Sequence, residues 1–277
     1  MKTRIGLGLG IAGLRDDQRF GELVDALEGH GFDSLWLSER VSGEAPDPVI
    51  GLAVAAGRTQ RIKLGTSVQV LPGRNPALLA KEWASLDRLS GGRALPAFGL
   101  GNPLAAEHQA FGVRREDRSP IFDEALPLMR RFWAEDDVHH DGEWFHYDGL
   151  SVRPKPIQPA MDVWLGGRAP SELRRCGRLG DGWLASFFTP ADCAEGRPTI
   201  EAAAANASRA IDPEHYGAMV TYTHDELPDA LRTRLTEYID VGFSKLVLVP
   251  LAEPDAAQGG WDAELARVAD AVLDLQT

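Results

Sequence analysis

Short apolar runs alternate with amphipathic segments along the chain. The runs predict eight strands, at residues 4–9, 34–37, 62–70, 94–98, 163–165, 183–186, 216–223 and 245–251. Helical periodicity is clearest near the C-terminus, in the series Trp261, Leu265, Val268, Val272 and Leu275. This alternation predicts a parallel sheet, and its eight repeats in 277 residues favour an α/β fold of the (β/α)8 TIM-barrel class. A doubly wound open sheet is the alternative.

Cap residues mark the starts of several predicted helices. Asp47-Pro48 and Asn75-Pro76 each place a capping side chain before a proline at the first helical position. Asp16-Asp17 offers an N-cap to the first helix, and Ser119-Pro120 opens a later one. These signals agree with the helix boundaries that the periodicity gives.

The alternation is interrupted between residues 138 and 160. This stretch has no helical period, carries an Asp141-Gly142 turn, and has prolines at 154, 156 and 159. We predict a hairpin near 138–150 followed by an extended connection. The hairpin is then an insertion in one barrel domain that covers residues 1–277.

Glycines in the first strand do not form a dinucleotide-binding fingerprint. Gly6, Gly8 and Gly10 lie inside the strand, and no G-x-G-x-x-G follows it. No acidic residue is well placed after the second strand to bind a ribose. The barrel is therefore favoured over a dinucleotide-binding sheet.

The balance of charge argues against two classes of partner. The chain has 29 basic and 41 acidic residues, a net charge of −12, so it repels nucleic acid and anionic membrane surfaces. No apolar run approaches the roughly 18 residues that a membrane span needs. The two cysteines, Cys176 and Cys193, exclude a disulfide framework and indicate a reducing compartment. We expect a cytoplasmic homodimer that binds a small-molecule substrate.

The carboxyl ends of the strands are the expected active-site face of such a barrel. Two of these ends are Gly-rich, Gly99-Leu100-Gly101-Asn102 and Gly166-Gly167-Arg168. The first would let the backbone approach a flat ligand closely. The second runs into a helix N-terminus, where an anion would be bound beside Arg168. Each segment is also consistent with a tight turn between strand and helix.

Opposite charges adjoin each other directly after the second strand, at Glu39 and Arg40. This pair is either an acid/base pair or ligand clamp at the barrel mouth, or a salt bridge on its rim. The other strand ends at this face are Gly8–Gly10, 68–70, Ser186-Phe187, 221–224 and Pro250-Leu251.

Metal and thiol chemistry are not expected. The spacing of His139, His140 and His146 suits no standard zinc motif, and their segment lies on the side of the barrel opposite the site. Cys176 and Cys193 have no evident base partner, and no G-x-S-x-G nucleophile motif is present. We therefore assign no metal ligand.

These segments together resemble the bacterial luciferase-like superfamily of flavin and deazaflavin monooxygenases and oxidoreductases. The resemblance runs from Gly6 to Pro250. The motifs that carry it are 31–36 (GFDSLW), 61–68 (RIKLGTSV), 75–77 (NPA), 91–93 (GGR), 154–156 (PKP), 158–159 (QP), 164–168 (WLGGR) and 180–183 (GDGW). Each motif is weak alone, and their order and spacing together are specific.

The resemblance implies a luciferase-like barrel whose mouth holds the isoalloxazine ring. Several members carry a non-prolyl cis peptide in a bulge on the third strand, which here would fall at Ser67–Val68. It further implies that Glu39 delivers or relays a proton. The residues expected to bind the cofactor are Ser67, Val68, Gln69, Gly99, Gly101, Asn102, Gly166, Gly167 and Arg168. Among them, Gln69 and Asn102 would hydrogen-bond the ring.

The branch that the sequence resembles most uses the deazaflavin coenzyme F420. Sugar-phosphate dehydrogenases of that branch have Asp-His in place of Glu39-Arg40 and an acid in place of Asn102. The missing His base argues against alcohol oxidation and favours a reductase that passes hydride from reduced F420 to an electron-poor small molecule. The alternatives are an FMN-dependent monooxygenase working with a separate flavin reductase, and a non-catalytic deazaflavin-binding barrel.

Overall fold

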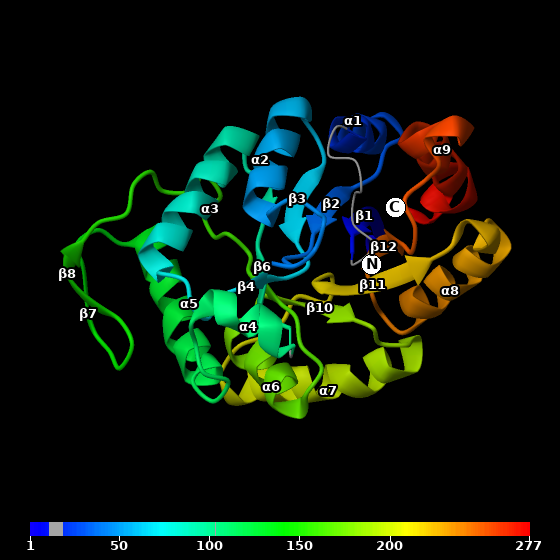
Figure 1. Cartoon of the computed structure of the whole chain (residues 1–277). Coiled ribbons are helices and arrows are strands. Elements are labelled where there is room, and N and C mark those ends of the chain that lie inside the picture. The colour runs from blue at the N-terminus through cyan, green and yellow to red at the C-terminus, as the bar shows by residue number, and fades with distance from the viewer. Residues whose placement is uncertain (11–18, 103) are drawn as a thin grey trace.

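Parallel strands lie at the centre of the molecule and helices surround them (Figure 1). The computed structural model describes residues 1–10, 19–102 and 104–277. The N-cap expected at Asp16-Asp17 lies outside these residues. The strands of the central sheet are β1 (Arg4–Leu9), β2 (Ser34–Leu37), β3 (Lys63–Thr66), β4 (Gln69–Val70), β5 (Ala94–Leu95), β6 (Ala97–Gly99), β9 (Trp164–Leu165), β10 (Gly182–Ser186), β11 (Tyr216–Tyr222) and β12 (Lys245–Pro250).

The strands pair in the order β4-β6-β9-β10-β11-β12-β1-β2-β3-β5, and every pair is parallel. β3 and β4 are two pieces of the predicted third strand, and β5 and β6 are two pieces of the fourth. Because β3 pairs with β5 while β4 pairs with β6, the two ends of this order meet. The predicted TIM-barrel class is confirmed.

Two predicted strands are interrupted, each for an identifiable local reason. The third strand was expected to be continuous over 62–70, but Ser67 and Val68 are joined by a cis peptide and lie outside both pieces. The fourth strand breaks at Pro96, which has no N–H to donate to a neighbour. The cis bond stands where the family resemblance placed it.

Helices form the outer layer of the barrel. They are α1 (Phe20–Gly29), α2 (Pro48–Arg58), α3 (Pro76–Ser90), α4 (Ala105–Phe111), α5 (Arg118–Ala134), α6 (Pro170–Leu179), α7 (Pro190–Asn206), α8 (Asp229–Asp240) and α9 (Gly260–Val272). Two predicted caps are present, since the Asp47 carboxylate and Asn75 amide oxygens accept the first free N–H groups of α2 and α3. The start predicted at Ser119-Pro120 is wrong, because α5 begins at Arg118 and both residues lie in its first turn. α4 is an addition that the periodicity did not predict.

The apolar core has two parts. Most buried side chains pack between the strands and the helices. A smaller cluster fills the barrel interior, and its buried members are Trp36, Ala97, Trp164, Leu184, Val247 and Val249. Half-buried Val68 and Met219 pack against this inner cluster, so the barrel is filled below the face where the strands end.

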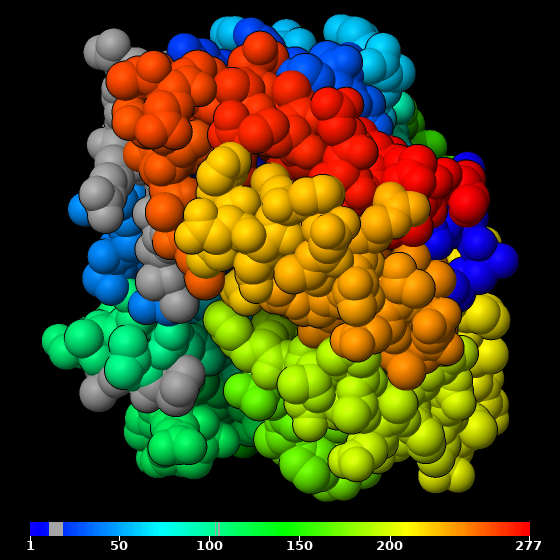
Figure 2. All heavy atoms as spheres, turned by 90° about the vertical axis from the view of Figure 1, so that its right-hand side faces the viewer, coloured from blue at the N-terminus to red at the C-terminus, as the bar shows by residue number. Residues whose placement is uncertain are grey.

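The two chain ends meet at one edge of the barrel. Figure 2 shows C-terminal residues (red) against N-terminal residues (blue) on this side of the molecule. Thr277 N donates to Thr3 O at 3.2 Å, and Thr3 N donates to Thr277 Oγ1 at 2.9 Å. Nearby, Lys245 Nζ on β12 donates to Asp33 Oδ2 at 2.6 Å, so an ion pair links the last strand to the residue before β2.

The predicted hairpin projects from the side of the barrel (Figure 1). Its strands β7 (Val138–Asp141) and β8 (His146–Leu150) pair antiparallel. Each of its histidines lies beside one carboxylate: His139 beside Asp148, His140 beside Glu124, and His146 beside Asp141. Among the described residues, no group of three or more His, Cys, Asp or Glu side chains is arranged to hold a metal.

Candidate functional site

A cavity of about 340 Å³ lies at the carboxyl ends of the strands. Its volume is within the usual range for a small-molecule site. The predicted site residues that line it are Glu39, Ser67, Val68, Gly99, Gly101, Asn102, Gly166 and Gly167. Gln69 and Arg168 do not line it. The fold thus brings eight of the ten predicted residues to one cavity.

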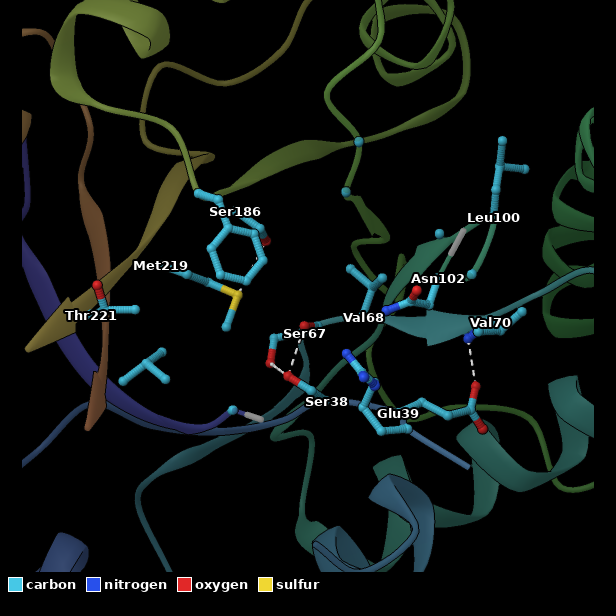
Figure 3. A pocket seen from close by; sticks show the side chains of 18 of the residues that line it. Ser38, Glu39, Ser67, Val68, Val70, Leu100, Asn102, Ser186, Met219 and Thr221 are labelled. Atoms are coloured by element: carbon cyan, nitrogen blue, oxygen red, sulfur yellow. Dashed lines mark hydrogen bonds between the residues drawn. The ribbon is translucent and has the colours of Figure 1, made fainter. Parts of the chain in front are cut away.

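Val68 forms part of the cavity wall and explains why two of the strand-end residues are glycine. A methyl group at residue 99 would lie 2.6 Å from Val68 Cγ2, and one at residue 166 would lie 2.9 Å from Val68 Cγ1. Both distances are shorter than real carbon contacts. Gly99 and Gly166 therefore leave room for Val68, which in turn presents an apolar surface to the cavity (Figure 3).

Glu39 is held by the segment that follows the cis bond. Its backbone N–H donates to Val68 O at 3.2 Å, and its Oε2 accepts from Val70 N at 2.6 Å. Its Oε1 pairs with the Arg74 guanidinium. Figure 3 shows the carboxylate directed toward Val70 and away from Met219. Burial raises the pKa of Glu39, while Arg74 and the Val70 N–H oppose the rise.

The salt bridge between Arg40 and Glu39, one of the two alternatives at the barrel rim, is not present. Arg40 lines the cavity, and its nearest carboxylate oxygen among the described residues is Glu107 Oε1, 4.0 Å from Arg40 Nε. That distance is too long for a hydrogen bond. Among the described residues, the buried Arg40 Nε has no hydrogen-bond partner. Glu107 is itself engaged, because it accepts from Val41 N at 2.9 Å and from Ser42 N at 3.1 Å.

Two serines connect β2 to the cis segment at the cavity wall. Ser38 Oγ donates to Ser67 O at 3.0 Å and lies 3.1 Å from Ser67 Oγ (Figure 3). Ser67 N also donates to Leu37 O at 2.9 Å. Together with Glu39, these contacts fix the segment 67–70 against the end of β2.

The N-terminus of α6 is already occupied by a carboxylate of the chain itself. Glu172 Oε2 accepts from Arg168 N at 2.8 Å and from Ala169 N at 2.9 Å. Gly167 has φ +136°, and a methyl group there would lie 2.5 Å from Glu172 Cβ. The exposed Arg168 guanidinium lies over the Phe188 ring, 5.2 Å from its centroid. In this geometry the expected anion-binding amides are not free, and Arg168 lies outside the cavity lining.

Gln69 has its side chain on the opposite face of its strand. It is fully buried, and its Oε1 accepts from Trp83 Nε1 of α3 at 2.9 Å. A side chain packed between strand and helix cannot reach a ring in the cavity. The expectation that Gln69 hydrogen-bonds the ring is therefore not supported.

Sequence reasoning missed several residues that complete the cavity. Met219 on β11 and Val249 on β12 line the cavity beside Thr221, which lies at a predicted strand end. The two-residue period of a strand would have selected them, since alternate side chains face the same side. Glu172 would have been found from its position three residues after the cap of α6.

The buried thiols take no part in the cavity. Cys176 and Cys193 are both free and buried, and burial raises the pKa of each. Neither lines the cavity described above. None of the helices in the described residues is long and apolar enough to cross a membrane.

The fold and the cavity are those of a known class. Residues 5–273 match the model of the luciferase-like monooxygenase family, and the chain belongs to this family. It is 32% identical over 206 residues to the F420-dependent glucose-6-phosphate dehydrogenase of Gordonia bronchialis, an alignment that covers 70% of this chain and 61% of that relative. The chain thus spans less than two thirds of that relative's length.

Solved structures share the whole fold at low sequence identity. Monooxygenase RslO1 from Streptomyces bottropensis matches with a TM-score of 0.86 and 19% identity, over 99% of both chains. The coenzyme F420 dependent tetrahydromethanopterin reductase from Methanopyrus kandleri matches with a TM-score of 0.83 and 17% identity, over 100% of both chains. These likenesses establish the luciferase-like barrel.

Proposed function

We propose that the protein is an F420-dependent oxidoreductase that reduces a small organic molecule. Arg40 favours reduction over oxidation. It lines the cavity at the position where a His base would be needed to oxidise an alcohol. A guanidinium donates hydrogen bonds and does not accept a proton. Relatives named F420-dependent dehydrogenases support the choice of cofactor.

The cavity fits a flat ring system. Val68, Val70 and Leu100 supply apolar surface on one side, and Met219 and Val249 supply it on the other. Bound F420 would supply the hydride chemistry. Ser67, Gly99, Gly101 and the other predicted lining residues would hold its ring, with Asn102 at the rim.

Glu39 acts in this proposal by orienting the cavity wall. Its contacts to Val68 O, Val70 N and Arg74 hold the cis segment against β2. A direct role in proton transfer, expected from the sequence, would require the carboxylate to leave these partners. We therefore propose positioning as its main role.

Separate titrations with F420, FMN and the bare deazaflavin chromophore test the cofactor. We expect F420 to bind more tightly than FMN. The fluorescence of the deazaflavin measures the binding of F420. Stoichiometric FMN in the purified protein, with no F420 binding, would favour the monooxygenase alternative, which needs a partner flavin reductase. Tight F420 binding without hydride transfer to any electron-poor acceptor would favour a non-catalytic binding protein.

We also propose that the protein is a homodimer through α2 and α3. These neighbouring helices expose Ile50 and Val54, and Leu78 and Leu89, with exposed fractions of 64%, 48%, 64% and 80%. Exposed apolar side chains on two neighbouring surface helices favour burial against a second copy of the chain. Light scattering of Ile50→Lys should then report a monomer.

We propose a cytoplasmic location as well. The two cysteines are free and buried, which fits a reducing compartment.

A further inference from the structure

Among the described residues that line the cavity, Arg40 is the one cationic side chain, and its buried Nε donates to no other group there. Of the charged residues in the described lining, Glu39 is bound to Val70 and Arg74, and Glu172 is bound to the N-terminus of α6. Arg40 is the third, and its buried Nε has no hydrogen-bond partner within the described residues. A buried N–H group without a partner costs free energy, which a ligand acceptor would recover.

The carboxylate of Glu107 does not accept a hydrogen bond from Arg40 but does balance its charge. Glu107 lies 4.0 Å away and is only 4% exposed, and its oxygens are engaged by Val41 and Ser42. The local charge is therefore close to neutral, which gives little attraction to a full anion such as a sugar phosphate. The donors of Arg40 still favour an uncharged oxygen that becomes more negative during a reaction.

We propose that Arg40 binds the carbonyl oxygen of an apolar conjugated carbonyl compound, an enone. This inference rests on the proposed function for the source of hydride. Hydride adds to the β-carbon of the C=C–C=O unit and the C=C electrons move to the oxygen, so a C–H bond forms and the carbonyl becomes an enolate. Arg40 donates a hydrogen bond to that oxygen. A proton from water then adds at the α-carbon, and the product is the saturated carbonyl compound.

The rest of the cavity agrees with this class of substrate. Val68, Leu100, Met219 and Val249 are apolar, and Ser38 is already bonded to Ser67. An apolar molecule with one carbonyl oxygen at Arg40 would contact the apolar side chains and also accept a hydrogen bond from the guanidinium.

Binding of matched probes to the protein without cofactor tests the proposal. The probes are trans-4-phenylbut-3-en-2-one, its hydrocarbon analogue trans-1-phenylbut-1-ene, and trans-cinnamate. We expect the enone to bind about ten-fold or more tightly than the hydrocarbon, since a hydrogen bond to a charged donor contributes about 1.5–3 kcal/mol. The enone absorption band should shift to longer wavelength, because the hydrogen bond lowers the energy of the excited state.

Variants assign the effect to the guanidinium. Arg40→Met should reduce the preference for the enone to within about two-fold and abolish the spectral shift, while Arg40→Lys should retain part of both. Arg131→Met is the matched control and should change neither, because this partly exposed arginine on α5 lies outside the cavity lining. An unchanged preference in Arg40→Met, tighter binding of cinnamate than of the enone, or no binding of any probe would overturn the proposal.

The same measurements separate this inference from the proposed function. If F420 does not bind but the enone preference depends on Arg40, the cofactor assignment is wrong and the carbonyl site stands. If F420 binds and is oxidised by other acceptors while Arg40→Met leaves enone binding unchanged, the cofactor assignment stands and the carbonyl site is wrong.

Discussion

The side chain of Val68 fills the space that a side chain at Gly99 would occupy, with only 2.6 Å between Val68 Cγ2 and the position of a Cβ at residue 99. The sequence suggested that Gly99 is a glycine because a ligand approaches its backbone. The structure gives an internal reason, which is that Val68 turns into the barrel mouth at the interrupted third strand. The glycine and the cis segment are therefore one feature of the fold.

Gly99→Ala should destabilise the protein by about 1–3 kcal/mol, the usual cost of overpacking a filled interior. Chemical denaturation measures the free energy of unfolding. The double variant Val68→Ala with Gly99→Ala should recover most of the loss, because the truncated side chain no longer meets the added methyl group. If the two substitutions are simply additive, Val68 is not the residue that requires glycine at 99.

The interruption of the third strand also explains why Gln69 does not line the cavity. Alternate side chains of a strand face the same side, and Ser67 faces the cavity. Continuous alternation would then turn residue 69 inward. Because the strand is interrupted after Thr66, Val68 and Val70 face the cavity instead, and Gln69 faces Trp83. Register at such a break cannot be read from apolar periodicity.

Most of the barrel could be predicted because each element has its own local signal. Asp47 and Asn75 cap their helices as expected, and every strand of the predicted set has a counterpart. The side-chain partners in the site could not be predicted in this way, because the tertiary structure determines which residues meet. Arg74 pairs with Glu39 although it is 35 residues away, and nothing in the sequence indicates this pairing. The sequence suggests Arg40 as the partner instead, because it is adjacent to Glu39.

Glu39→Gln should leave the free energy of unfolding within about 1 kcal/mol of wild type, because the loss of the charge-assisted bond to Arg74 is offset by relief of the burial that raises the pKa of Glu39, and the acceptor for Val70 N remains. Turnover at saturating F420 should stay within a few fold of wild type. A proton relay would instead lose about 10²–10⁴-fold in turnover at the same stability. Stopped-flow oxidation of reduced F420, beside denaturation of the same variant, distinguishes these outcomes.

Lys245→Met should destabilise the protein by about 1.5–3 kcal/mol, because it removes the bond to Asp33 and leaves that carboxylate only Arg4, whose Nε lies 4.0 Å from Asp33 Oδ1. The side chains of Lys245 and Asp33 are 5% and 19% exposed, so solvent screens this pair poorly. Lys245→Met combined with Asp33→Asn should cost less than the sum of the two single changes, which urea denaturation of all three variants measures. Additive losses would mean that the ion pair contributes no coupling across the end of the barrel.

Glu107 should make stability depend on pH in the acid range. The hydrogen bond from the Ser42 hydroxyl, followed by those from the Ser42 and Val41 N–H groups, lowers the pKa of Glu107 in the folded protein. A carboxyl whose folded pKa is lowered stabilises the fold fully above its unfolded pKa, about 4.3 for Glu. That contribution is lost as the pH falls from this value through the lower folded one.

Glu107→Gln should therefore be less stable than wild type at pH 7, and the difference should narrow as the pH falls below about 4.3, the usual Glu pKa. The amide keeps the size of the side chain but removes the charge that Val41, Ser42 and Arg40 face. Free energies of unfolding at several pH values measure the difference, and Glu143→Gln on the exposed hairpin is the control for removing a carboxyl elsewhere. A difference that is the same at pH 7 and pH 3.5 would show that the amide fails for steric reasons and that the charge of Glu107 does not hold the loop after β2.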